Sequence, residues 1–234
     1  MKQYICDIYT KIEERAKSNQ TFVEFEHDKL TYRSLLKFIL RFNYYSKKKQ
    51  IEKNSIFLIV SSNEKYVIQL LISSIILGYT PVILSADIKS KRLRGIIEKT
   101  NPVLIFIDQK ILDSISWLEE FNYLLIPKER KTIIAVFKQI KLHPKSILNV
   151  LKATAKLYTK ELFIKNNKAL AFISFTSGTT SQPKGVMTTY ENLFEHLETI
   201  MKLFNYNESS KIFNNLVLAH NDGFVQGPLI SLFS

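Results

Sequence analysis

Cysteine, glycine and proline are scarce in this 234-residue chain, which holds one cysteine, six glycines and six prolines. The single cysteine, Cys6, excludes an internal disulfide and is typical of a reducing compartment, which predicts a cytoplasmic location. The sequence also shows no internal repeat and no low-complexity tract. With 46% hydrophobic and 23% charged residues, its composition is that of an ordinary folded domain rather than of a disordered chain.

The sequence lacks both a signal peptide and an unbroken apolar run long enough for a membrane span. Residues 66–86 carry no charge over about the length of such a span, but Gly78 and Pro81 interrupt them. We therefore predict a buried helix that ends at Gly78, followed by a short strand. The first 18 residues contain charges throughout and predict an amphipathic helix, whose apolar face holds Ile5, Ile8, Tyr9 and Ile12.

Acidic residues are outnumbered, and the formal net charge is +12 with a pI near 9.6. Such a charge suits an anionic partner such as nucleic acid, a membrane surface or a nucleotide, but compositional bias in the gene can produce it too. We favour the second interpretation, because the lysines are scattered and only residues 46–49 form a dense run. The sequence has no arginine-rich helix and no zinc-finger spacing, so it does not predict specific nucleic-acid binding. No metal site is predicted either, since Glu195 and His196 are adjacent and cannot face each other on a helix.

Short apolar runs rich in β-branched residues predict strands that are buried on both faces. Helical patterns over residues 31–48, 63–77 and 87–100 alternate with them. This alternation predicts an α/β fold with mainly parallel, buried sheet flanked by helices. Asp87 is the expected N-cap of the third helix, and Pro102 follows its end. The expected strands are residues 56–60, 82–85, 103–107, 123–126 and 170–175.

We divide the chain into three parts. Residues 1–126 form an N-terminal α/β subdomain, residues 127–167 a strongly basic connector, and residues 168–234 a second unit. In this last unit we expect the strand 170–175, a polar loop, and a helix over 188–204 with Thr189 as its cap. A short strand and a polar turn around His220 should follow.

The loop is the most informative stretch. Residues 175–185 read FTSGTTSQPKG, with five hydroxyl side chains, two glycines and one lysine. Glycines let backbone N–H groups approach a phosphate, hydroxyls add donors, and a lysine supplies positive charge. The spacing is not that of the common nucleotide P-loop, because Lys184 precedes Gly185. A flexible surface linker is the alternative, but it does not explain a Pro-Lys-Gly ending directly after a buried strand.

The longer stretch FTSGTTSQPKGVMTTYENL is similar to the phosphate-binding signature of the adenylate-forming superfamily of AMP-dependent synthetases and ligases. KLTYRSLLKF near the N-terminus resembles the opening helix of that superfamily, and LVLAHNDGFVQGPL resembles a segment whose histidine lies near the acyl pocket. The superfamily includes acyl-CoA synthetases and the adenylation domains of peptide synthetases. The resemblance implies a triphosphate-binding set made of Thr176, Ser177, Gly178, Thr179, Thr180, Lys184 and Gly185.

The resemblance also implies a reaction. ATP, as its Mg²⁺ complex, and a carboxylate substrate give an acyl-adenylate and pyrophosphate, and a thiol of coenzyme A or phosphopantetheine then takes the acyl group. Lys184 and His220 would be the catalytic residues, with a turn histidine satisfied by its neighbours as the less favoured alternative for His220. The sequence departs from the family pattern at Ser181, where glycine is usual, and at Tyr190, where histidine is common.

The largest departure is length, since family members are about twice as long. The resemblance covers the N-terminal part of the family's large domain and stops after the His220 segment. We therefore expect an incomplete domain that is inactive alone, with the C-terminal half in trans or a carrier protein as partner. Two alternatives stay open: a catalytically incompetent remnant that acts as a nucleotide-binding or interaction module, and a basic protein for membrane surfaces or nucleic acid.

Overall fold

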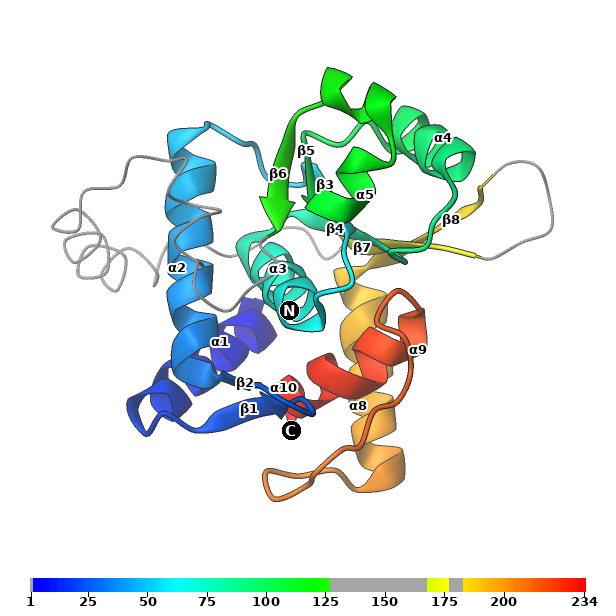
Figure 1. Ribbon diagram of the computed structural model, residues 1–234. Helices are drawn as coiled ribbons and strands as arrows, with labels where there is room; N and C mark the ends of the chain where they lie inside the picture. Colours follow the sequence, from blue (N-terminus) through cyan, green and yellow to red (C-terminus); the bar gives the residue numbers. More distant parts are fainter. Residues whose placement is uncertain (1, 127–167, 177–182) are drawn as a thin grey trace, which may run out of the picture.

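The computed structural model describes residues 2–126, 168–176 and 183–234. Its centre is a six-stranded sheet with the strand order β6-β5-β3-β4-β7-β8 (Figure 1). Five strands are parallel, and β8 runs antiparallel to β7. The strands are β3 (Ile56–Val60), β4 (Thr80–Leu84), β5 (Leu104–Asp108), β6 (Tyr123–Ile126), β7 (Leu170–Phe175) and β8 (Gly185–Thr189). The predicted α/β class with a mainly parallel sheet is confirmed.

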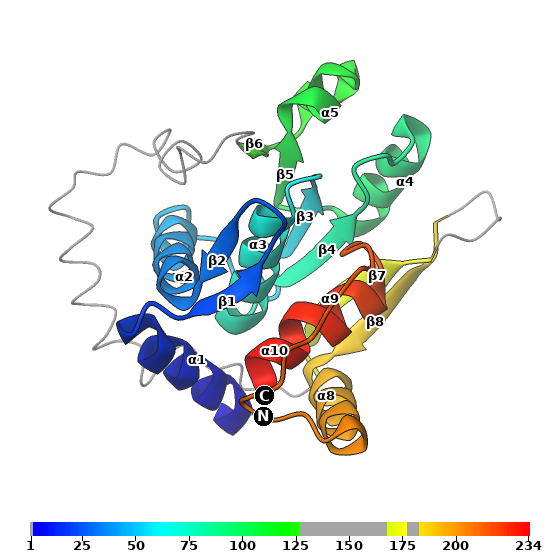
Figure 2. The ribbon, with the colours of Figure 1, turned by 60° about the horizontal axis from the view of Figure 1, so that its bottom comes forward.

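Helices cover both faces of this sheet, as Figures 1 and 2 show. Alternate residues of β3 point to opposite faces, so that Phe57 and Ile59 join one apolar cluster while Leu58 and Val60 join the other. The larger cluster includes α1 (Lys2–Lys17), α2 (Tyr32–Lys48), α3 (Glu64–Leu77) and α8 (Tyr190–Phe204). The smaller includes α4 (Ser90–Thr100), α5 (Gln109–Asp113) and the 3₁₀ helix η1 (Ser116–Glu120). Burial on both faces explains why these strands are continuous apolar runs.

The N-terminal segment and the uncharged stretch 66–86 both form helices that pack in the core. The predicted apolar face of α1 is confirmed, because all four of its named residues are buried. The uncharged stretch forms α3, which ends at Gly78 in the left-handed conformation with φ 77°, and then β4. In the described part of the chain, no helix is long and apolar enough to cross a membrane.

The expected cap of α4 is wrong. Asp87 accepts a hydrogen bond from the Ser85 hydroxyl, and the backbone makes a turn in which Ile88 N donates to Ser85 O at 3.2 Å. The turn delays the start of the helix, so Lys89 takes the N-cap position without a side-chain hydrogen bond to the helix.

The second unit also differs from the prediction. Residues 185–189 form β8, so α8 begins at Tyr190, although the expected cap Thr189 does accept a hydrogen bond from Asn192 N at 3.2 Å. The strand expected before His220 does not form. Its residues pack instead against a helical run made of α9 (Asn221–Phe224), the π-helical turn η2 (Val225–Leu229) and α10 (Ile230–Phe233). The connector over 127–167 lies outside the described residues.

A small antiparallel hairpin that the sequence did not predict precedes the main sheet. Its strands are β1 (Thr21–Glu24) and β2 (Lys29–Thr31). The hairpin leads directly into α2, whose N-terminus carries a reciprocal capping box between Thr31 and Ser34.

Candidate functional site

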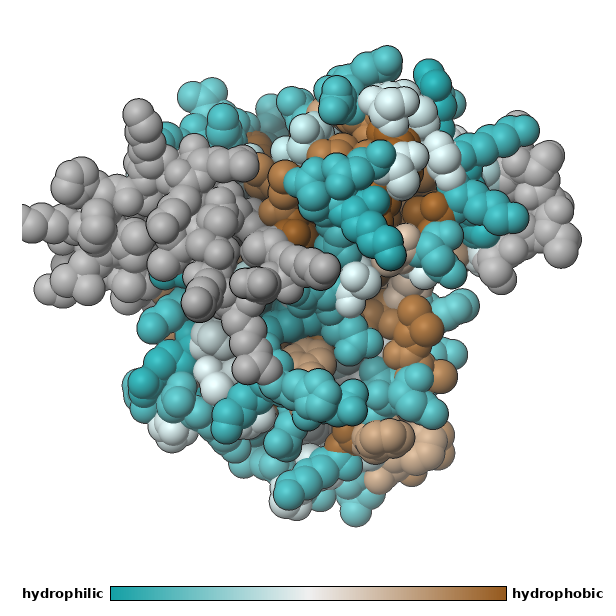
Figure 3. Space-filling model, in the orientation of Figure 1, coloured by the Kyte–Doolittle hydropathy of each residue, from teal (hydrophilic) through white to brown (hydrophobic). Residues whose placement is uncertain are grey.

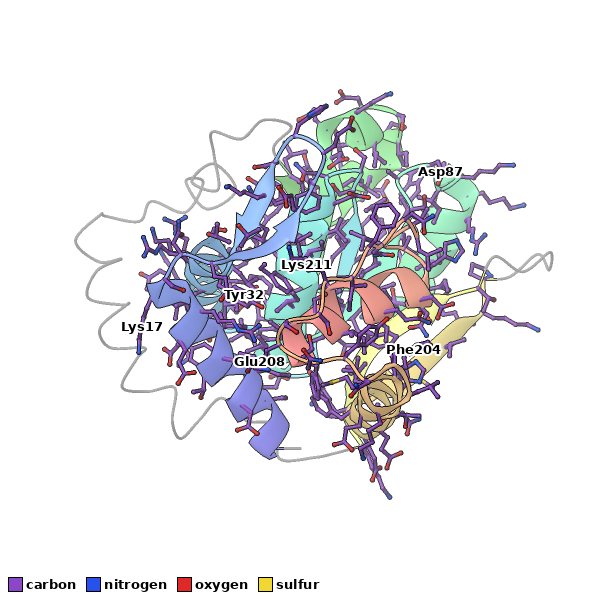
Figure 4. All side chains as sticks on the ribbon, turned by 90° about the horizontal axis from the view of Figure 1, so that it is seen from below. Lys17, Tyr32, Asp87, Phe204, Glu208 and Lys211 are labelled. Carbon is purple, nitrogen blue, oxygen red and sulfur yellow. The ribbon has the colours of Figure 1, made fainter. Side chains whose placement is uncertain are left out.

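Polar residues gather where the parallel strands end. Because β3, β4, β5 and β7 run the same way, the residues that follow them meet at one edge of the sheet. Ligands of open α/β sheets bind at this carboxyl edge. The residues there are Ser61 and Ser62 after β3, Ser85 and Asp87 after β4, Asp108 at the end of β5, and Thr176 after β7; Figure 4 labels Asp87.

The β3–β5 side of this edge is closed by its own hydrogen bonds. The Asp108 carboxylate accepts from the Ser61 hydroxyl at 2.6 Å, from Ser62 N at 2.8 Å and from the Ser62 hydroxyl at 2.9 Å. These polar groups hold two neighbouring strand ends together. The predicted site residue Thr176 lies on the other side of this edge, where β4 and β7 end.

On that side, the hydroxyl-rich segment (residues 176–185) connects β7 to β8. Its two ends are described: Thr176 N donates to Lys184 O at 3.2 Å, and Phe175 pairs with Gly185 across the strands. The Lys184 side chain is exposed. Ser177, Gly178, Thr179 and Thr180 lie outside the described residues, as does Ser181. The structure therefore brings together Thr176, Lys184 and Gly185 of the predicted set.

Gly185 has a packing reason to be glycine. A Cβ atom there would lie 3.2 Å from the Phe175 ring and 3.2 Å from Ile173 Cγ2, closer than most carbon contacts. The aromatic ring of β7 thus lies over the backbone of β8 directly beside Lys184. This contact fixes the lysine-bearing end of the segment against the sheet.

Helix α4 supplies contacts that the sequence did not predict. The Arg92 guanidinium donates to Thr176 O, and Lys99 Nζ donates to Pro183 O at 3.2 Å. Gly95 lies between them and faces the Pro183 ring. Each pair of hydrogen-bonded residues is 84 positions apart, so no local pattern could reveal it.

His220 begins α9 and is exposed. Its backbone N–H closes the expected polar turn by donating to Val217 O at 2.9 Å, and no side-chain capping bond is formed. Asp222 accepts a hydrogen bond from the Gln226 amide at 3.3 Å. The last residue of α9, Phe224, contacts β7, because its ring and the Phe172 ring meet edge to face at 4.8 Å. His220 is therefore attached to the strand that leads into Thr176.

Tyr190, which stands where the family often has histidine, has a structural role. It is fully buried, and its hydroxyl donates to Ile75 O at 2.7 Å. Burial raises the pKa of this phenol well above its ordinary value, so the hydroxyl stays protonated. Tyr190 thus joins α8 to the end of α3 rather than facing the hydroxyl-rich segment.

A separate groove of about 960 Å³ lies between the β1–β2 hairpin and the segment after α8. Arg15 reaches from α1 to the Tyr32 hydroxyl at 2.8 Å and lies 3.7 Å from Glu208. Figure 4 shows Tyr32, Glu208 and Lys211 around this groove. Of the predicted site residues that the structure describes, Thr176, Lys184, Gly185 and His220, none lines this groove.

Apolar side chains are exposed on the segment between α8 and α9. In Figure 3, brown surface appears at the lower right, where Figure 1 draws this segment, and also in the upper part of a largely hydrophilic molecule. The residues are Phe213, Leu216 and Val217, of which Phe213 is 91% exposed. Phe213 and Leu216 also line the groove.

A mainly parallel sheet covered by helices on both faces, with polar residues at the carboxyl ends of its strands, defines an α/β class of protein. The sequence matches the family of AMP-binding enzymes over residues 12–234, and the chain belongs to that family. The resemblance to adenylate-forming ligases is thereby confirmed.

Solved structures of this family share the fold. VinN superposes with a TM-score of 0.76 at 18% identity, over 97% of this chain and 57% of the VinN chain. The fatty acyl-adenylate ligase of L. pneumophila, solved with acyl adenylate and pyrophosphate, gives 0.71 at 18% identity, over 97% of this chain and 38% of the ligase. At these identities the likeness establishes the shared fold.

Sequence relatives are ligases. JamA of Moorena producens, a medium-chain fatty acid–acyl-carrier-protein ligase, is 38% identical over 69 residues, which are 30% of this chain and 12% of JamA. The chain thus spans little more than half of VinN and a smaller share of the other two proteins.

Proposed function

We propose that this chain provides the triphosphate-binding part of an AMP-forming ligase that activates a carboxylic acid with ATP. The observation that carries the proposal is the position of Lys184 at the carboxyl edge of the sheet. Its side chain is exposed, its backbone oxygen accepts from Thr176 N, and the next residue, Gly185, packs closely against Phe175 and Ile173. The acyl-adenylate and pyrophosphate held by a structural relative support the same chemistry.

In the proposed reaction, a carboxylate oxygen attacks the α-phosphorus of the Mg²⁺ complex of ATP. A bond forms between these two atoms, and the bond from the α-phosphorus to the bridging oxygen breaks. Pyrophosphate leaves with the electron pair. Negative charge therefore grows on the leaving phosphates, where preorganised donors and cations lower the barrier.

We assign the leaving phosphates to the hydroxyl-rich segment. The Lys184 ammonium would balance their charge, while Thr176, Ser177, Gly178, Thr179, Thr180 and Gly185 would supply hydroxyl and backbone N–H donors. His220, at the start of α9, would lie by the acyl group and the adenylate. A thiol of coenzyme A or of a carrier-protein phosphopantetheine would then take the acyl group, as the name of the relative JamA suggests.

Calorimetric titration with a non-hydrolysable ATP analogue and Mg²⁺ tests the phosphate site. Lys184→Ala should weaken binding about 10- to 100-fold, because a hydrogen bond to a charged group contributes about 1.5–3 kcal/mol. Affinity for AMP, which lacks the β- and γ-phosphates, should change little. Lys202→Ala is the control, since Lys202 is exposed on α8 and 3.8 Å from Glu198. Equal losses for both nucleotides, or for both variants, would contradict the assignment of Lys184.

Carboxylate-dependent exchange of pyrophosphate into ATP tests the reaction itself. Exchange by this chain alone would place the activation step within its 234 residues. Binding without exchange, restored by a second polypeptide, would support a site shared between two chains. Binding that no added chain converts into exchange would favour the alternative of a nucleotide-binding module. His220→Ala should leave affinity for the ATP analogue intact and reduce exchange.

A further inference from the structure

Helix α4 touches both ends of the hydroxyl-rich segment with one face. Arg92, Gly95 and Lys99 are spaced three and four residues apart, which places them along the same side of a helix. Arg92 holds the carbonyl of Thr176 at the start of the segment, and Lys99 holds the carbonyl of Pro183 near its end. The two ends are also joined directly by the Thr176–Lys184 backbone bond.

Gly95 sets how closely α4 approaches. A Cβ atom built there would lie 3.7 Å from Pro183 Cγ, which is ordinary van der Waals contact. Alanine therefore fits at this position, whereas a longer side chain would extend into the Pro183 ring. Glycine at this position keeps the face of α4 that meets Pro183 free of a side chain. It does so at a cost of about 0.5–1 kcal/mol relative to alanine inside a helix.

These contacts orient the backbone as well as hold it. No peptide bond in the described residues is cis, and in a trans peptide the C=O and the following N–H point in opposite directions. Because Lys99 draws Pro183 O toward α4, the N–H of Lys184 points away from α4. A donor aimed in this direction, next to the Lys184 ammonium, suits a phosphate oxygen.

The contacts of Arg92 and Lys99 are specific to their places on the helix. Arg94, on the same helix, faces elsewhere: it pairs with Glu98 at 3.1 Å, and its guanidinium lies 5.4 Å from the centre of the Trp117 ring. Arg94 therefore has the same kind of charge on the same element, while its partners are Glu98 and Trp117 and not the described ends of the segment.

We infer that Arg92, Gly95 and Lys99 are positioning residues that hold the described ends of the segment, Thr176 and Pro183–Lys184, where Thr176 and Lys184 can bind the triphosphate. The identity of the ligand, a triphosphate, rests on the proposed function. The positioning role rests on the contacts that α4 makes with Thr176 and Pro183. It assigns to α4 a share in nucleotide affinity without any contact to the nucleotide.

Affinity for the ATP analogue with Mg²⁺ tests the inference. The double variant Arg92→Gln with Lys99→Gln and the single variant Gly95→Leu should each weaken binding about tenfold, the order of loss that a displaced binding group causes. AMP affinity should stay unchanged. The loss in Gly95→Leu matters most, because this variant changes no charge and so separates positioning from simple electrostatic attraction. Arg94→Gln and Gly95→Ala are the matched controls and should bind like the unaltered chain.

Amide hydrogen exchange provides a measurement that does not depend on nucleotide binding. The Thr176 amide, which is bonded to Lys184 O, should exchange faster in the double variant and in Gly95→Leu. Arg92→Lys with Lys99 intact should restore part of the protection, since lysine keeps a charged donor. Urea unfolding of each variant shows whether the whole fold is retained.

The two proposals fail in different ways. If the unaltered chain binds no nucleotide but the Thr176 amide loses protection in the variants, the phosphate site is wrong, while the contribution of α4 to the order of the segment ends is retained. If Thr176 exchange and ATP-analogue affinity both stay unchanged in the double variant, the positioning role is wrong. If Arg94→Gln loses as much affinity for the ATP analogue as the double variant, the positioning role is also wrong, and the loss reflects a general effect of charge.

Discussion

At the residue scale, the two glycines of α4 and α9 have opposite surroundings. Gly95 has room for a methyl group, whereas a Cβ atom on Gly223 would lie 2.2 Å from the backbone oxygen of Val217. The segment before His220 lies directly on this glycine, and Asn214 donates to Gly223 O at 2.7 Å. Close approach of two backbones, rather than a special dihedral angle, is what requires glycine at position 223.

Replacing Gly223 should therefore be costly. We expect Gly223→Ala to lower the free energy of unfolding by about 3 kcal/mol, because a backbone must shift to admit the methyl group. Gly95→Ala should instead raise it by about 0.5–1 kcal/mol. Urea unfolding followed by circular dichroism measures both. Equal effects of the two substitutions would show that the contact of Gly223 with Val217 is unimportant for stability.

At the scale of elements, helix α2 begins with a double hydrogen bond. Thr31 Oγ1 accepts from Ser34 N at 3.2 Å, and Ser34 Oγ accepts from Thr31 N at 3.1 Å. The box also joins α2 to the β1–β2 hairpin, because Thr31 is the last residue of β2. A short hairpin of this kind is only marginally stable by itself, so the cap supports two elements.

Removing this cap should weaken the N-terminal region. Thr31→Ala is expected to lower the free energy of unfolding by about 1 kcal/mol, while Thr31→Ser, which keeps the accepting oxygen, should cost a few tenths. A double-mutant cycle with Ser34→Ala, read by urea unfolding, tests the reciprocity. Strictly additive losses would argue against a reciprocal box.

Elements that are buried on both faces were predictable, and those that depend on distant contacts were not. The runs 56–60, 123–126 and 170–175 coincide with strands, because burial on both faces leaves an unmistakable apolar signature. Strand β8 was missed since its residues Val186 and Met187 are exposed and carry no such pattern. The strand expected before His220 failed because its residues pack on Gly223 instead of on a neighbouring strand.

The candidate site divides in the same way. The hydroxyl-rich segment could be recognised from residue types and spacing, since these determine which donors and charges are present. Its neighbours could not, because Arg92 and Lys99 reach it from a helix 84 residues earlier in the chain. The structure confirms where Thr176, Lys184 and Gly185 meet, while their role toward phosphate stays a prediction.

At the scale of the whole molecule, stability should depend on pH through Lys53. Its amine donates to Leu77 O at the end of α3 and lies 4.9 Å from the centre of the Tyr79 ring. Desolvation at this position, with repulsion from Lys47, lowers the pKa of Lys53 to about 8 from 10.5. Between these two values the unfolded chain binds more protons than the folded one, so the free energy of unfolding rises with pH in this window.

We compare the free energy of unfolding of the unaltered chain with that of Lys53→Gln. The difference, unaltered minus variant, should increase as the pH is raised from 8 to 10 and should be constant below pH 7. Urea unfolding at each pH measures the difference, and taking the difference removes the contribution of the other lysines and tyrosines. A difference that falls over this range would mean that the folded chain favours the charged amine.

The strand order has a consequence for how the molecule is made. Strand β4 lies inside the sheet only because β7 pairs with it, and the Thr80 hydroxyl donates to Leu170 O across 90 residues of sequence. At about 5–20 residues per second, a ribosome needs roughly 5–18 s to bridge that separation. During this time the nascent chain has a mainly apolar strand with an open edge, which favours pairing with other nascent chains. Translation pauses and chaperone binding should matter most in this interval, before residues 170–175 emerge.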